Sequence, residues 1–190
     1  MKPKIGRKLI FLVCAAALGS GCAAVTKNTV QSFDVKTDRI DSGTAFNRVT
    51  GILVDRGFDI KTSNKDAGIL TTEYKKFASE GDSPPFDYYL QIKTSMRTAS
   101  DGRLDVRLTP IVKEQNRLNA AAYTEHELEY YTGDPNSVHL IKSMRPGGWR
   151  VMGQTLFMNV VTDVAEVAGV SVEEVGQNIT TTPADAITAQ

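Results

Sequence analysis

Cysteine, histidine and tryptophan are scarce in this chain of 190 residues, which contains two, two and one of them. Both cysteines, Cys14 and Cys22, lie near the start, so the remainder has no pair that could form a disulfide. The sequence also has no G-x-S-x-G nucleophile elbow, no P-loop and no dinucleotide-binding fingerprint. We therefore expect a non-catalytic protein without a cofactor, stabilised by its hydrophobic core alone.

An excess of positive charge is also missing. The chain has 22 basic and 22 acidic residues, but four of the basic ones, Lys2, Lys4, Arg7 and Lys8, precede an N-terminal apolar run. No acidic residue lies in that segment, so the rest of the chain is weakly acidic, with 18 basic against 22 acidic residues. A weakly acidic chain without clusters of lysine and arginine is poorly suited to phosphate backbones. We therefore expect no binding to nucleic acid.

The N-terminal segment has the three parts of a secretory signal. Its basic head is followed by an apolar run over residues 9–18 and by small residues over 19–21. The apolar run has ten residues, and a stable membrane-spanning helix needs roughly twenty. Because the small residues end at Cys22, the segment resembles a bacterial lipoprotein signal with Leu18-Gly19-Ser20-Gly21-Cys22 as its lipobox. The resemblance implies a signal peptide over residues 1–21 and acylation of Cys22.

This resemblance also predicts where the protein lies. Two or three acyl chains hold a protein at a membrane in effect permanently. Residue 23 is Ala, whereas an Asp at that position retains lipoproteins of enteric bacteria in the inner membrane. The resemblance therefore implies a protein bound through lipidated Cys22 to the outer membrane and facing the periplasm. Ordinary secretion, with cleavage near residues 15–24, is the alternative, and it discards Cys22 or leaves it as a lone thiol.

A polar segment follows the signal, and periodic patterns follow that segment. Residues 22–37 lack a sustained period, which predicts a lipidated tether, within which Phe33 and Val35 fit a short first strand. Residues 38–170 are expected to form a single domain. Residues 171–190 predict a short helical turn, started by a capping box of Ser171 and Glu174, and then a disordered tail.

Helical and alternating patterns are separated along that domain. Helical spacing predicts one helix from about Asp41 to Gly57 and a long one over residues 149–168, ended by Gly169. Between them, alternation predicts strands over residues 58–61, 69–77, 86–97, 104–108 and 123–131, with a loop or bulge over 113–122. Pro110 is expected at an edge or a break in pairing. We therefore expect an α+β two-layer sandwich, with an antiparallel sheet of about four to five strands covered on one face by two helices.

Part of the domain resembles a known family. An aromatic-led helix beginning with Ala45-Phe46 ends at Gly57-Phe58-Asp59-Ile60, and an Asp66-Ala67-Gly68 turn leads to the Thr-x-aromatic pattern Thr72-Glu73-Tyr74. This pattern resembles the helix-grip repeats of BamC-like outer-membrane lipoproteins, which hold two such domains where this chain has room for one. The resemblance implies a helix-grip-like fold and accessory or scaffolding work with protein partners of an outer-membrane or periplasmic assembly.

The candidates for binding a protein partner are Tyr89, Arg145, Trp149 and Arg150. Aromatic residues and arginine are enriched at interfaces, and Tyr89 lies on the polar face of its predicted strand. Trp149 stands between two arginines after a proline-glycine turn. Of its two interpretations, an exposed interface anchor or a residue that packs the last helix against the sheet, we favour the second.

A metal site and an internal ligand site are the alternatives to a partner surface. On a strand, Glu125, Glu127 and Glu129 share one face and His126 lies on the other, so they do not converge and we expect no metal. Helices packed on a curved sheet can instead leave an apolar groove, which would make the protein a periplasmic carrier of a lipid or another hydrophobic ligand. Large residues such as Phe46, Tyr88, Phe157 and Trp149 would fill a solid core, whereas a cavity beneath them would favour the carrier.

Overall fold

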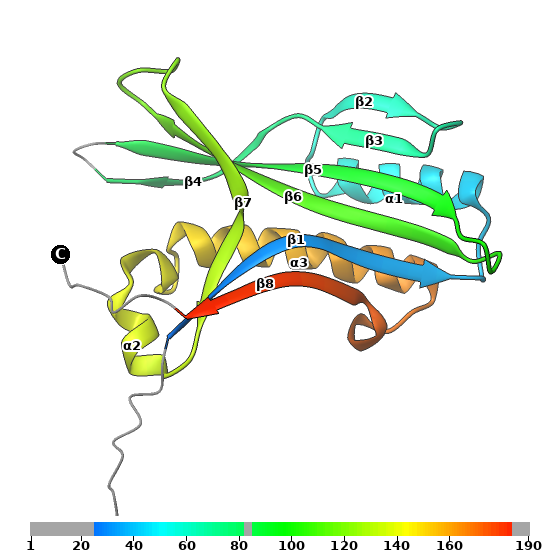
Figure 1. Cartoon of the computed structure of the whole chain (residues 1–190). Coiled ribbons are helices and arrows are strands. Elements are labelled where there is room, and N and C mark those ends of the chain that lie inside the picture. Colours follow the sequence, from blue (N-terminus) through cyan, green and yellow to red (C-terminus); the bar gives the residue numbers. More distant parts are fainter. Residues whose placement is uncertain (1–24, 82–84, 184–190) are drawn as a thin grey trace, which may run out of the picture.

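The computed structural model describes residues 25–81 and 85–183 and shows a curved antiparallel sheet with helices packed against it (Figure 1). The strands are β1 (Thr26–Thr37), β2 (Ile60–Asn64), β3 (Ile69–Thr72), β4 (Lys75–Glu80), β5 (Phe86–Thr98), β6 (Leu104–Asn116), β7 (Tyr123–Thr132) and β8 (Gly176–Pro183). The helices are α1 (Ser42–Asp55), α2 (Pro135–Leu140) and α3 (Trp149–Ala168), with 3-10 turns η1 (Lys142–Met144) and η2 (Val172–Glu174).

The sheet is larger than the sequence predicts. Its strands lie in the order β2-β3-β5-β6-β7-β1-β8, and β4 pairs with the part of β5 that β3 leaves free. The two long helices, α1 and α3, contact each other and pack behind the sheet as it is seen in Figure 1. The prediction of about four to five strands is wrong, because eight strands pair within the described residues.

Most of the discrepancy at the N-terminal side comes from β1. The sequence predicts a tether over residues 22–37 with only a short strand at Phe33 and Val35, whereas all of residues 26–37 pair antiparallel with β6, β7 and β8. The pairing register with β8 shifts between Val30 and Ser32, so a bulge interrupts the alternation and both Val30 and Phe33 are buried, three positions apart. Because of this irregular spacing, the sequence of β1 does not show the period of two that predicts a strand.

The C-terminal side holds the second correction. A disordered tail was expected after the Ser171 turn, but residues 176–183 form β8 beside β1. The capping box of Ser171 and Glu174 is present as predicted. Strand β8 buries little: only Ile179 is partly covered, and side-chain bonds such as Gln31 Nε2 to Thr180 Oγ1 (3.1 Å) supplement the backbone ladder. Because β8 is held mainly by backbone hydrogen bonds, its sequence has no alternating apolar pattern from which a strand could be predicted.

The two long helices begin and end where the sequence predicts. Asp41 caps α1, because its Oδ1 accepts a hydrogen bond from Thr44 N at 2.9 Å. Gly169 takes the left-handed conformation (φ 66°) that ends α3. The apolar stripes of both helices and the covered face of the sheet form one core, which includes Phe33, Val35, Phe46, Val49, Leu53, Leu90, Ile92, Val106, Leu108, Leu128, Phe157, Val161 and Val164.

Strand β6 changes its neighbour at Pro110. Its residues 104–108 pair with β1 and its residues 111–115 pair with β7, while β5 lies along the whole of its other side. Pro110 belongs to neither of the two shorter ladders, which agrees with the predicted break in pairing. Beyond it, residues 111–116 continue the strand, so the loop or bulge predicted over 113–122 is shorter than expected.

Candidate functional site

Three tyrosines surround one lysine on the face of the sheet that the helices do not cover. The lysine is Lys113 of β6, and its Nζ lies 4.6 Å from the ring centroid of Tyr89 on β5. The same atom lies 5.0 Å from the ring of Tyr74, between β3 and β4, and 5.6 Å from that of Tyr123 on β7. We call these four residues the tyrosine-lysine cluster. Such cation–π contacts each stabilise by about 0.5–1 kcal/mol at exposed sites.

The side chains of the cluster differ in their exposure to solvent. Tyr89, Tyr74 and Lys113 are partly buried, whereas Tyr123 is 56% exposed. Burial, together with hydrogen bonding to Glu125, raises the pKa of Tyr74 above the usual range for tyrosine. Aromatic rings around a fixed positive charge suit recognition of a partner surface better than proton transfer.

A protruding hairpin extends this surface. The β6–β7 turn projects beyond the rest of the sheet in Figure 1 and carries Leu118, which is 82% exposed. Tyr123 begins β7 directly after this turn, so the turn that carries Leu118 connects the strand of Lys113 to Tyr123. A single exposed apolar residue is common on protein surfaces, so the cluster rather than Leu118 carries the argument for an interaction surface.

The structure places the four sequence candidates in two different regions. Tyr89 belongs to the cluster, as its position on the polar face suggests. Arg145 and Trp149 instead line a pocket of about 400 Å³ at the start of α3. Arg145 is exposed, and its Nε donates to the backbone oxygen of His139 at 2.9 Å. The candidates therefore do not form a single site.

Trp149 is a packing residue. It is 5% exposed and stacks on Tyr88, with ring centroids 4.4 Å apart and planes 7° apart. The guanidinium carbon of Arg150 lies 4.1 Å from the Trp149 ring centroid, and Arg150 Nη2 lies 3.4 Å from Glu129 Oε2. This arrangement joins the start of α3 to β5 and β7, as the favoured interpretation of Trp149 expects.

Sequence reasoning missed four members of this surface, namely Lys113, Tyr74, Tyr123 and Leu118. The sequence predicts a loop at Lys113, and only the pairing of the strands shows that Tyr74 and Tyr123 lie beside it. Tyr89 pairs with Lys113 across β5 and β6. The acidic and aromatic alternation of residues 123–131 was a usable signal, because it put Tyr123 on the same face as Glu125.

The structure also shows where the residues of the metal alternative and a pocket relevant to the carrier alternative lie. The ring of His126 lies 5.9 Å from that of Trp149, on the side of the sheet opposite the cluster. Over residues 25–81 and 85–183 no three His, Cys, Asp or Glu side chains gather as a possible metal site. A pocket between α3 and strands β1, β7 and β8 has about 200 Å³ and is lined by residues such as Val30, Phe33 and Phe157. Ligand pockets usually hold about 300–1,000 Å³.

Cys22 and the signal segment lie outside the described residues, so acylation stays a prediction. In the part of the chain that the structure does describe, no helix combines the length and apolar character needed to cross a bilayer.

Comparison with known proteins adds two distant structural neighbours. No family model and no curated protein match the sequence. A TBP-like protein from Parabacteroides distasonis superposes with a TM-score of 0.42 at 17% identity, covering 73% of this chain and 90% of its own. A DUF4468 family protein from Bacteroides ovatus gives 0.41 at 16% identity, covering 74% and 85%. TM-scores this low support no conclusion about fold or function. The resemblance to BamC-like lipoproteins stays a prediction.

Proposed function

We propose that the chain is a non-catalytic, lipid-anchored protein of the bacterial outer membrane that binds a protein partner in the periplasm through the tyrosine-lysine cluster. The observation that supports this proposal is the gathering of Tyr74, Tyr89 and Tyr123 around Lys113 on the open face of the sheet. Hot spots of protein interfaces are enriched in such aromatic residues. An accessory or scaffolding role in an envelope assembly fits a surface of this kind.

The carrier alternative has weaker support. The pocket between α3 and the sheet is smaller than most ligand pockets, and Phe33 and Phe157 fill the neighbouring core with ring centroids 5.6 Å apart. A ligand of drug or lipid size would need these rings to move. The partner surface requires no such rearrangement, and we therefore favour it.

The anchor is tested by the Cys22→Ala variant. We expect the native protein to start at Cys22, to carry the mass of two or three acyl chains and to sediment with outer membranes, because these chains bind in effect permanently. The variant is expected to remain uncleaved or to be released. Intact mass spectrometry and membrane fractionation measure both properties. A soluble, unacylated native protein would contradict the anchor and leave a freely diffusing periplasmic protein.

The partner surface is tested by crosslinking from Tyr123. A photo-crosslinking amino acid at this position, which is 56% exposed, is expected to give a discrete adduct in cells of the native host. Ile69 of β3 is the matched control, because it is 45% exposed but belongs to a different part of the sheet. Lys113→Ala combined with Tyr89→Ala should remove the adduct from residue 123 because it removes the centre of the cluster. Equal adducts from residues 69 and 123, or none from either, would contradict the proposal.

A further inference from the structure

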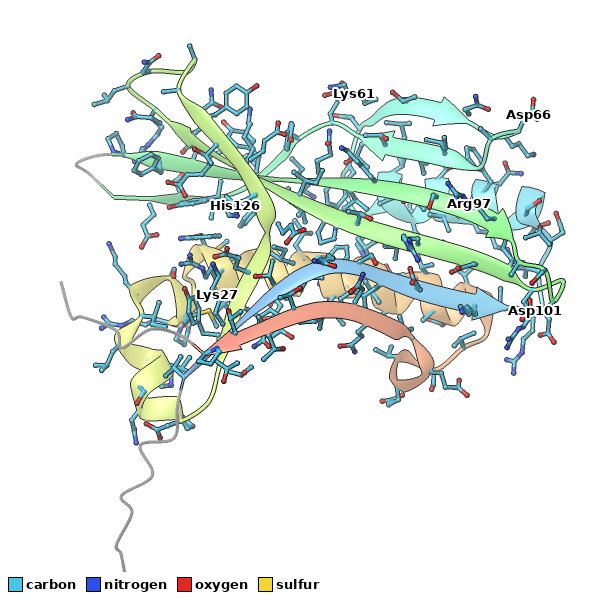
Figure 2. All side chains as sticks on the ribbon, in the orientation of Figure 1. Lys27, Lys61, Asp66, Arg97, Asp101 and His126 are labelled. Atoms are coloured by element: carbon cyan, nitrogen blue, oxygen red, sulfur yellow. The ribbon has the colours of Figure 1, made fainter. Side chains whose placement is uncertain are left out.

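The end of the domain that carries its N-terminus also carries α2 and η1. Thr26, the first residue of β1, pairs with Thr132, the last residue of β7, and α2 begins at Pro135 soon after it. Figure 2 labels Lys27 at this end of the sheet and Asp101 at the opposite end. Val25 is already buried, and it lies only three residues after Cys22. Three residues span at most about 11 Å, so a lipid on Cys22 would bring the bilayer surface to this end of the domain.

Helix α2 contributes no side chain to the hydrophobic core. None of its residues is buried. Asp134 caps it, because Oδ2 accepts hydrogen bonds from Ser137 N at 3.0 Å and from Ser137 Oγ at 2.8 Å. Helices this short are marginal in water unless packing supports them. Local capping and contacts with η1 and β7 therefore hold α2 in place, and its side chains stay partly or fully exposed.

The last residue of α2 and the residues that follow it expose an apolar side chain and two cations. Leu140 is 68% exposed, the side chain of Lys142 is 74% exposed, and Arg145 is exposed as well. Residues 134–150 contain three basic residues and one acidic residue, in a chain that is otherwise weakly acidic. Glu80 lies 3.5 Å from Lys142 Nζ, but the lysine keeps most of its surface in solvent. Apolar side chains flanked by lysine and arginine are typical of segments that lie in the interface of anionic membranes.

We propose that residues 135–145 dock on the anionic surface of the bilayer, with Leu140 among the headgroups and Lys142 and Arg145 near the lipid phosphates. The proposal rests on the proposed function, because acylated Cys22 is what holds the bilayer against this end. That covalent connection also makes lipid, rather than a second protein, the expected occupant. Tyr123 and Thr132 stand at opposite ends of β7. At about 3.3 Å per residue the cluster then lies roughly 30 Å from the docked end.

The test places one polarity-sensitive label at residue 140. The full chain with Leu140→Cys is produced in a host that acylates lipoproteins, where signal removal and acylation leave the new thiol as the only free one. The protein is labelled with an NBD dye and reconstituted into vesicles of phosphatidylethanolamine and phosphatidylglycerol that carry a nitroxide lipid. Leu118→Cys is the matched control, because Leu118 is 82% exposed and lies at the other end of β7.

We expect blue-shifted emission and nitroxide quenching of the label at residue 140 and neither effect at residue 118. Lys142→Glu with Arg145→Glu should abolish both effects at residue 140. Water-like emission at both positions, in protein whose mass and flotation prove acylation, would overturn the docking surface alone. A blue shift without nitroxide quenching would mean burial against protein and would overturn it too. An unacylated protein would overturn the anchor together with this proposal, and its mass reveals that case before any vesicle is prepared.

Discussion

Replacing Trp149 by alanine is expected to lower the free energy of unfolding by about 3–5 kcal/mol, the usual range for a large aromatic side chain removed from a core. Trp149 is 5% exposed, stacks on Tyr88 and starts α3, so its loss opens a cavity where helix and sheet meet. Domains are stable by roughly 5–15 kcal/mol in all, so this loss is a large fraction. Urea unfolding followed by circular dichroism measures the change.

Leu118→Ala is the control for this experiment. Leu118 is 82% exposed, and substitutions at such positions change stability by no more than about 0.5 kcal/mol. A Trp149→Ala protein that unfolds at the same urea concentration as the wild type, yet no longer forms the crosslinked adduct, would show that Trp149 belongs to the binding surface instead.

The second large effect is expected at Gly68, between β2 and β3. Gly68 has a φ of +64°, and a Cβ atom there would lie 2.2 Å from the backbone oxygen of Met96. Gly68→Ala therefore combines the left-handed conformation, about 1–2 kcal/mol, with an overpacking effect of about 1–3 kcal/mol. We expect a total loss of about 2–5 kcal/mol, because the turn cannot move away easily: Met96 N also donates to Gly68 O at 2.8 Å and holds the two segments together.

Gly102→Ala separates these two contributions. Gly102 has a φ of +82° but no atom within 4 Å of a Cβ built on it, so only the conformational effect of about 1–2 kcal/mol applies. Thermal unfolding of both variants gives the comparison. Equal losses at the two glycines would mean that the turn moves away from Met96 and that the close approach has no energetic importance.

The parts of the fold that could be predicted are those that local chemistry determines. Asp41, Gly57 and Gly169 limit the two long helices through caps and a left-handed conformation, which need no knowledge of distant residues. Strands β5 and β6 alternate because one face packs on the helices. By contrast, β1 is interrupted by a bulge, and β8 is an edge strand that buries almost nothing. Their existence depends on pairing between distant segments, for which the sequence carries no period.

The candidate site was predictable only in part for a related reason. Tyr89 could be assigned to an open face from alternation within its own strand. Its relation to Lys113 requires the register of β5 against β6, and its relation to Tyr123 requires that β7 follow in the sheet. The packing role of Trp149 could be predicted because helical spacing in the sequence already indicates the long helix that it starts.

The pairing of β1 also sets an order in which the domain can fold. In the described residues its partners are β6, β7 and β8, and the nearest of them along the chain begins at Leu104. Segments such as α1 and the β2–β3 hairpin make local contacts, which form quickly, whereas pairings between distant segments form slowly. Residues 26–37 therefore cannot pair until the C-terminal half of the chain has been synthesised. The complete β1–β8 ladder also requires residue 183. The strand next to the proposed signal peptide is thus expected to be among the last parts of the sheet to form.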